Sequence, residues 1–331
     1  MGAGAIGCCL GMRLHAAGYP VRFVGSESLA QEVRRHGLTL TDYDERRISL
    51  APEQVSFATS AAGLTGCAMV LVTVKSLDTH AAAQALAPYL AADALIVSFQ
   101  NGIQNPDILR QGLPAHPVLA GMVPFNVTRR SPTHFHQGTS GSLFIEKGAR
   151  AAPLRQALRA AGFTVVPSAN MNEILWGKLI INLNNAFNAL LGVPLREQIA
   201  SPLCRKTVAA VMEEALAVLH AAGIRPARAG KVIPWLMPKI MRLPNFLFLR
   251  LAAAMAKIDP VARSSMWEDL SRGRPTEIDF LNGEVVSLGR KLGHPTPLNE
   301  RIVELVKQAE QRKTPSCLSP EQLARVLQYP S

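Results

Sequence analysis

The chain has 331 residues, is 48% hydrophobic and carries a formal net charge of +11. This length predicts about two domains, and the apolar content supports a sizeable core. The basic residues are scattered and not interleaved with aromatics, which argues against a nucleic-acid partner and favours small anionic ligands. Prolines and charges interrupt the apolar stretch 232–256, so we expect no membrane span. Five cysteines without metal-ligand spacing indicate no metal, no disulfide framework and a reducing cytoplasm.

The N-terminus reads Gly2, Ala3, Gly4, Ala5, Ile6 and Gly7, which is the spacing of a dinucleotide-binding turn. In such a turn the first glycine allows a tight bend, the second lets the backbone approach a pyrophosphate, and the third lets helix pack on strand. All six residues are therefore candidate cofactor contacts. Only Met1 precedes them, so we expect either a start upstream of Met1 or a sheet without its first strand. The alternative is a purely structural turn.

The rest of the first half alternates helices with apolar runs. Helices are predicted at 6–17, 28–36, 79–90 and 152–161, and strands at 21–24, 68–74, 94–99, 118–127 and 141–146. Continuous apolar runs such as 68–74 are typical of strands buried on both faces. The pattern predicts an α/β Rossmann-type fold, a doubly wound parallel sheet with its first strand truncated.

From about Met171 the pattern changes to long amphipathic stretches. Helices are predicted at 171–191, 201–222, 262–271, 276–292 and 298–312, with a short one at 321–328. The sequence therefore predicts a Rossmann domain over residues 1–167, an all-α domain over 168–314 and a tail over 315–331.

Polar residues follow two of the buried strands, where an open α/β sheet binds its ligands. Lys75 could meet a phosphate or ribose, and Asn101 a ribose or a substrate oxygen; each could equally be an ordinary loop residue or helix cap. After the second strand of such a fold, an acid favours NAD and a base favours NADP. Ser26 and Glu27 stand there and leave the choice open.

In the second half, Lys178, Asn182 and Asn185 fall within roughly 60° of one another on a helix. A lysine held in a partly buried cleft has a lowered pKa and can donate a proton near neutral pH. The alternative is a solvated polar stripe. Thr276 is predicted to cap a helix, with Glu277 in its first turn, where an acid can be purely structural. His134 and His136 lack a third ligand and are interpreted as non-metal.

These segments together resemble the ketopantoate reductases (2-dehydropantoate 2-reductases) over about residues 2–312. The more specific matches are 175–179 with Asn182, 264–266, 274–279 and 282–283. The resemblance implies NADPH-dependent reduction of 2-dehydropantoate to (R)-pantoate, in the pathway to coenzyme A, with an NADP-binding first domain and a substrate-binding second one. It implies Lys178 and Glu277 as catalytic residues, Lys75, Asn101, Thr128 and Glu277 on the cofactor, and Asn101, Lys178, Asn182, Asn185 and Ser265 on the substrate.

Two departures keep alternatives open. The family often has an arginine where Ser26 stands, so NADH is not excluded. It often has a second helix asparagine where Ala186 stands, and Asn185 could substitute for it. The alternatives are a related 2-oxo acid reductase of the same fold and an impaired nucleotide-binding relic. A small anionic 2-oxo acid is the expected partner, and the protein is expected to be a monomer or homodimer.

Overall fold

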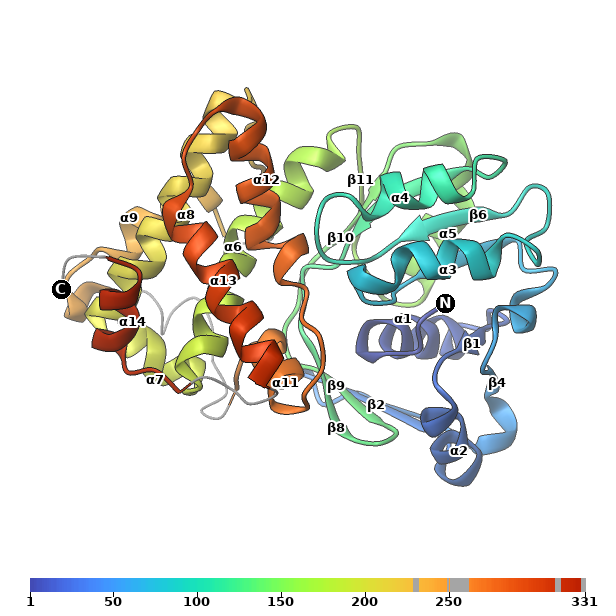
Figure 1. The fold of residues 1–331 in the computed structure, drawn as a ribbon. Coiled ribbons are helices and arrows are strands. Elements are labelled where there is room, and N and C mark those ends of the chain that lie inside the picture. Colours follow the sequence, from blue (N-terminus) through green and yellow to red (C-terminus); the bar gives the residue numbers. More distant parts are fainter. Residues whose placement is uncertain (229–231, 249, 251–261, 313–316, 329–331) are drawn as a thin grey trace. The chain divides into compact units, whose positions relative to one another are not determined.

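The structure is a computed structural model that describes all residues except 229–231, 249, 251–261, 313–316 and 329–331. The chain forms two compact units, Met1–Asn172 and Glu173–Ser331 (Figure 1). The first is α/β and the second is built from helices.

The first unit is organised around a five-stranded sheet in the order β11-β10-β7-β6-β5. Its strands are β5 (Met69–Val72), β6 (Leu95–Ser98), β7 (Val118–Met122), β10 (Leu143–Glu146) and β11 (Val165–Ser168). All neighbours are parallel except β7 and β10. The predicted strands at 68–74, 94–99 and 141–146 are confirmed, each slightly shorter. The predicted run 118–127 ends at Met122, and a separate strand begins at Val127.

Helices cover both faces of this sheet (Figure 1). One face packs against α3 (Thr79–Leu86) and α4 (Asn105–Gly112). The other packs against α1 (Ala5–Ala16) and α5 (Ala152–Ala160). The expected doubly wound arrangement is thus present, and the interior strand β6 is buried at all four of its positions.

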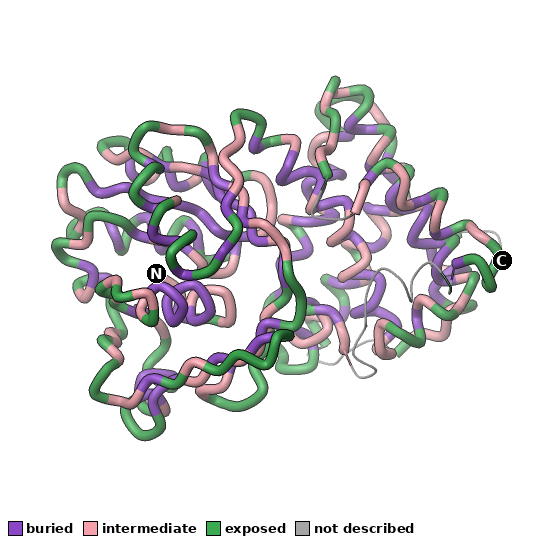
Figure 2. The backbone as a smooth tube through the Cα atoms, turned by 180° about the vertical axis from the view of Figure 1, so that it is seen from behind, coloured by how far each residue is buried: buried purple, intermediate pink, exposed green. Residues whose placement is uncertain are grey.

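A second sheet has the order β3-β2-β9-β8 and was not predicted. It consists of β2 (Leu38–Asp42), β3 (Arg47–Leu50), β8 (Val127–Ser131) and β9 (His134–Gln137). Leu38, Leu40 and Phe135 from its inner face join α1 in one core, so α1 has a sheet on either side. This explains why α1 is buried along most of its length (Figure 2) and lacks an amphipathic pattern.

The glycine turn lies between β1 (Arg22–Val24) and β5. β1 pairs in parallel with β4 (Ser56–Ala58), and α2 (Glu27–His36) follows β1. The Met1 amine donates to the Leu71 carbonyl at 2.9 Å, and the Gly2 amide donates to the Val24 carbonyl at 2.9 Å. Residues 1 and 2 therefore bridge two strands that belong to separate hydrogen-bonded sheets.

The second unit begins inside helix α6 (Met171–Leu191), whose first two residues belong to the first unit. Its other helices are α7 (Leu195–Ala200), α8 (Pro202–Ala221), α9 (Met237–Met241), α11 (Ser265–Ser271), α12 (Asn282–Leu292), α13 (Pro297–Arg312) and α14 (Pro320–Val326). The predicted helices at 171–191, 201–222 and 298–312 are confirmed. Short 3-10 segments η1 to η6 occupy Pro52–Gln54, Ala61–Leu64, Ser76–Asp78, Ala149–Ala151, Pro234–Leu236 and Ile278–Phe280. Among the described residues, no helix is long and apolar enough to cross a membrane.

The predicted helix 276–292 is wrong at its start. Only η6 forms over Ile278–Phe280, and α12 begins at Asn282 after a break at Leu281, whose ψ is −94°. Thr276 is therefore not a helix cap, and Glu277 does not lie in the first turn of an α-helix. Instead the Ile278 amide donates to Thr276 Oγ1 at 3.2 Å, a local bond that competes with helix formation.

Candidate active site

The three glycines of the N-terminal turn differ in how much space surrounds them. Gly2 has φ +96°, and a Cβ there would lie 2.5 Å from the Val74 nitrogen. A Cβ on Gly7 would lie 2.3 Å from the Gly2 carbonyl oxygen. A Cβ on Gly4 would meet no atom within 4 Å. The outer two glycines are thus required by packing, whereas the middle one leaves open space beside the backbone.

That open space lies at the N-terminus of α1. Gly4 is the N-cap and supplies no capping side chain. The amides of a first helical turn have no intrahelical partner and carry the positive end of the helix dipole. An exposed glycine followed by such amides fits a bound pyrophosphate.

Ser26 follows β1 close to this turn. A Cβ on the preceding Gly25 would lie 2.9 Å from the Ala3 Cβ, so the end of β1 packs on the glycine turn. Ser26 caps α2 by accepting from the Leu29 amide at 3.4 Å, and its Oγ lies 3.2 Å from Ser28 Oγ. Ser26 and Ser28 therefore place two hydroxyls after β1, where the sequence leaves the cofactor choice open.

Lys75 and Asn101 end up on neighbouring loops, after β5 and β6 respectively. Both are half-buried. Ser76 Oγ donates to the Asn101 carbonyl at 3.0 Å, which joins the two loops directly. Since Val74 also contacts Gly2, the structure gathers Lys75, Asn101 and the glycine turn at the carboxyl ends of β1, β5 and β6.

Thr128 lies in the other sheet. It is exposed on β8, and its Oγ1 donates to the His136 carbonyl at 3.5 Å. The rings of His134 and His136 on β9 both lie 2.9 Å from Thr41 Oγ1. Within the described part of the chain, no group of three or more His, Cys, Asp or Glu side chains could hold a metal.

In the second unit, Lys178, Asn182 and Asn185 lie on α6. All three are half-buried, while Leu179, Leu183 and Ala186 beside them are buried. The three polar side chains thus form one partly accessible stripe along α6, in which Ile181 and Asn184 are also half-buried. This arrangement differs from a fully solvated surface stripe.

The pKa of the Lys178 side chain lies well below that of an ordinary lysine. Burial lowers the pKa of its ammonium group to about 8, and the nearby Glu277 carboxylate acts in the opposite direction. Glu277 is itself buried, just before η6. The structure therefore brings together the two residues expected to be catalytic, from segments far apart in the chain.

Asn185 and Ser265 are brought together by Ser264. Ser264 Oγ donates to the Asn185 carbonyl at 2.9 Å and accepts from the Trp267 amide at 3.2 Å, which caps α11. The Ser264 amide donates to Asn188 Oδ1 at 2.8 Å. Ser265, the exposed first residue of α11, is thus fixed beside the polar stripe of α6.

Gly177 has a packing role next to Lys178. A Cβ on Gly177 would lie 2.0 Å from the Ala227 carbonyl oxygen, and the Ala227 amide donates to the Glu173 carbonyl at 2.8 Å. The chain near residue 227 therefore crosses α6 directly at Gly177. No larger residue fits there without movement of backbone.

Comparison with known proteins agrees with this geometry. Residues 1–150 match the family model "Ketopantoate reductase PanE/ApbA", and residues 170–310 match "Ketopantoate reductase PanE/ApbA C terminal". The crystal structure of a PanE/ApbA family ketopantoate reductase from Ralstonia eutropha JMP134 is 33% identical, with a TM-score of 0.81 over 95% of this chain and 98% of that one.

The chain belongs to the ketopantoate reductase family.

A 2-dehydropantoate 2-reductase from Archaeoglobus fulgidus is 26% identical over 94% of this chain and 96% of its own length. D-mandelate dehydrogenase, solved with NADH and anilino(oxo)acetate, is 22% identical with a TM-score of 0.77 over 94% of this chain and 97% of that one, and shows that the fold is shared. As a member of the ketopantoate reductase family, the protein is an oxidoreductase acting on a ketone.

Sequence reasoning missed several buried and half-buried polar residues that support the candidate site. Thr73 Oγ1 donates to the Gly2 carbonyl at 2.7 Å. Asn188 Nδ2 donates to Gln198 Oε1 at 2.8 Å and ties α6 to α7. A further group surrounds the Lys75 and Asn101 loops: Ser76, Thr79, Ser98, Gln100 and Asn105. The sequence signal for this last group is the presence of polar residues directly after apolar strands. That pattern does not show whether a polar side chain is buried.

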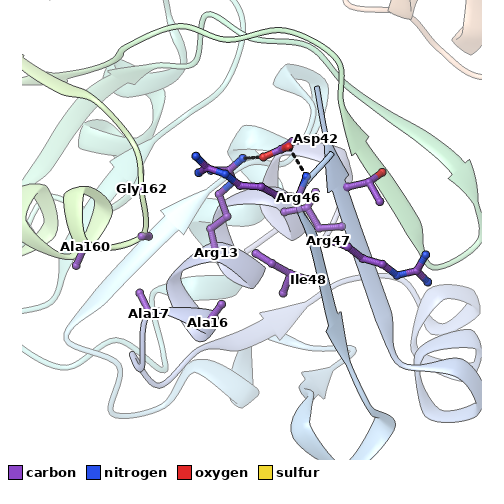
Figure 3. Close-up of a pocket in the computed structure, with 12 residues that line it drawn as sticks. Arg13, Ala16, Ala17, Asp42, Arg46, Arg47, Ile48, Ala160 and Gly162 are labelled. Carbon is purple, nitrogen blue, oxygen red and sulfur yellow. Dashed lines mark hydrogen bonds and ion pairs between the residues drawn. The ribbon is translucent and has the colours of Figure 1, made fainter. Parts of the chain in front are cut away.

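A hollow of about 520 Å³ lies at the opposite end of α1 from the glycine turn (Figure 3). Arg13 Nη2 contacts Asp42 Oδ2 there at 2.6 Å, and Asp42 Oδ1 also accepts from the Arg46 amide at 3.0 Å. The Arg47 guanidinium points away from Arg13 in Figure 3. The hollow includes none of the predicted site residues, and Arg13 and Asp42 tie α1 to the β2–β3 hairpin.

Proposed function

We propose that the protein reduces 2-dehydropantoate to (R)-pantoate with NADPH, as a step of pantothenate and coenzyme A biosynthesis in the cytoplasm. The observation that carries this proposal is the half-buried Lys178, with a pKa of about 8, beside the buried Glu277 carboxylate. A group of this kind can donate a proton near neutral pH.

We propose the first unit as the cofactor domain. The open space at Gly4 and the uncapped first turn of α1 fit a pyrophosphate. Gly2 to Gly7, Lys75, Asn101 and Thr128 are the proposed contacts, with Glu277 on the ribose side. When bound, the reduced nicotinamide supplies the hydride that the ketone carbon needs.

We propose the helical unit as the substrate domain. The Lys178 ammonium stabilises the charge that develops on the ketone oxygen and gives that oxygen its proton. Such acid catalysis contributes about 10²–10⁴-fold. Glu277 orients the lysine and a hydroxyl group. Asn182, Asn185 and Ser265, together with Asn101, hold the carboxylate and hydroxyl groups of the small anionic acid.

The residues that follow β1 carry groups suited to either cofactor. Ser26 and Ser28 offer hydroxyls to a 2′-phosphate, and Glu27 offers a carboxylate to a ribose hydroxyl. We propose NADPH, in line with the family resemblance, with NADH as the alternative. The assembly is proposed to be a monomer or homodimer; the ketopantoate reductase of Staphylococcus aureus is described as dimeric.

The deciding experiment is a steady-state assay of the purified protein on 2-dehydropantoate, with NADPH and with NADH. Turnover with a clear preference for NADPH supports the proposal. If the protein binds the cofactors but reduces 2-dehydropantoate with neither NADPH nor NADH, the proposal is rejected.

A second candidate is reduction of a related branched 2-oxo acid. It is favoured by Ala186, which is fully buried on α6 where the family often has a polar side chain. A panel of 2-oxo acids in the same assay separates the two candidates, because the true substrate has the highest kcat/KM. A chain that binds cofactor and reduces no panel member would instead be the impaired relic.

A further inference from the structure

Five polar side chains are buried beneath the two loops that carry Lys75 and Asn101. Their exposed fractions are 1% for Ser76, 0% for Thr79, 2% for Ser98, 5% for Gln100 and 0% for Asn105. Burying this many polar groups is costly unless each finds a hydrogen-bond partner. The site therefore contains a polar core where a purely structural core would be apolar.

Thr79 is the central member of this group. Its Oγ1 accepts from Gln100 Nε2 at 2.7 Å and donates to Asn105 Oδ1 at 2.6 Å. Gln100 Nε2 also donates to the Val74 carbonyl at 3.1 Å, and Gln100 Oε1 accepts from Ser98 Oγ at 3.0 Å. One hydroxyl thus connects the β6 side of the network to α4.

The other end of the network converges on the Asn101 carbonyl. Ser76 Oγ donates to it at 3.0 Å, and Asn105 Nδ2 donates to it as well. Asn105 Nδ2 also donates to Ser76 Oγ at 3.1 Å. The direction of every hydrogen bond is consistent, since each hydroxyl donates once. Two buried donors therefore fix the backbone from which the Asn101 side chain projects.

We propose that Thr79 is a positioning residue, which acts through Gln100 and Asn105 to hold Asn101 at the cofactor. The assignment of Asn101 to the cofactor and substrate rests on the proposed function. Thr79 itself lies at the start of α3, fully buried. Its effect on the reaction is transmitted by the loop that follows β6.

The test uses Thr79→Val, which keeps the shape and removes the hydroxyl. Asn105 Oδ1 and Gln100 Nε2 then lose their shared partner. We expect kcat/KM to fall about 10- to 100-fold, as for a misplaced site residue. Thr79→Ser, which retains the hydroxyl, restores most of the activity. Thr207→Val is the matched control: Thr207 is equally buried, but its hydroxyl donates to the Leu203 carbonyl within its own helix α8 at 2.9 Å, and kcat/KM should be unchanged.

A double-mutant cycle with Asn101→Ala separates positioning from general stabilisation. If Thr79 acts through Asn101, Thr79→Val has little further effect on kcat/KM once the Asn101 side chain is gone. Additive losses across the cycle would overturn the proposal. Thermal melts of all variants establish that each is folded at the assay temperature.

The same cycle is measured on the dissociation constant for NADPH, by fluorescence titration. This readout does not depend on the substrate. If the wild type does not reduce 2-dehydropantoate, the proposed function fails, but a non-additive binding cycle still supports the role of Thr79. An additive binding cycle contradicts it, whatever the substrate proves to be.

Discussion

The Glu277 carboxylate lies close enough to the Lys178 ammonium to raise the pKa of that lysine. Burial has the larger effect, and the result is a pKa of about 8, against 10.5 for an ordinary lysine. The two opposing influences set the pH range in which the proposed acid is charged. Neither burial alone nor the Glu277 carboxylate alone would give the lysine this pKa.

The pair predicts a specific pH dependence of the reduction. The proton donor is the charged lysine, which predominates below its pKa, so kcat/KM should be constant at lower pH and fall as the pH rises through about 8. Glu277→Gln removes the influence that raises the pKa, so the fall should move to lower pH. The measurement is the pH profile of kcat/KM for both proteins. A profile that does not move would show that Glu277 does not tune this lysine.

Replacement of the lysine tests its chemical role. Lys178→Ala should lower kcat at least about 100-fold, because acid catalysis of the ketone oxygen is lost. The dissociation constant for NADPH should change little, since the proposed cofactor contacts lie mainly in the first unit. Lys206→Ala, an exposed lysine on α8, is the control and should keep full activity. Equal rates for Lys178→Ala and the wild type would remove Lys178 from the mechanism.

The glycine turn allows a matched pair of substitutions. Gly4→Ala adds a Cβ that meets no atom of the protein, so the melting temperature should hold, while NADPH binding weakens because the methyl occupies the space offered to the pyrophosphate. Gly7→Ala puts a Cβ 2.3 Å from the Gly2 carbonyl oxygen and should destabilise the fold by about 1–3 kcal/mol. Thermal melts and fluorescence titrations of both variants check this. Unweakened binding by Gly4→Ala would argue against a pyrophosphate there.

Cofactor preference can be tested at Ser26. Ser26→Arg places a cation beside the expected 2′-phosphate, so affinity for NADPH should rise relative to NADH. The substitution also removes the α2 cap, which costs about 1 kcal/mol. The control Ser26→Ala loses the cap without adding charge. Parallel titrations with both cofactors give the ratio of affinities; an unchanged ratio in Ser26→Arg would place the 2′-position away from residue 26.

The helices and strands with a clear pattern within their own segment of the chain were predicted from the sequence. The helix 171–191 was predictable from its helical spacing of apolar residues, and the buried strands around 69–72 and 95–98 from their continuous apolar runs. The sheet of β2, β3, β8 and β9 was missed because its strands are only four or five residues long, and such short runs carry a weak periodic signal. The helix expected at 276–292 was misplaced because the Thr276 hydroxyl bonds an amide two residues on and stops the helix from starting.

The sequence by itself determined the dinucleotide turn, the alternation of apolar strands and helices in the first unit, and the single helix face shared by Lys178, Asn182 and Asn185. These follow from spacing, since the backbone geometry of a turn or helix repeats at fixed intervals. Only the tertiary structure decided that Glu277 acts on Lys178, that Ser264 joins Asn185 to α11, and that a buried hydroxyl of Thr79 underlies Asn101. Burial and hydrogen bonding between distant segments set pKa values and side-chain positions, and no local pattern records which segments will meet.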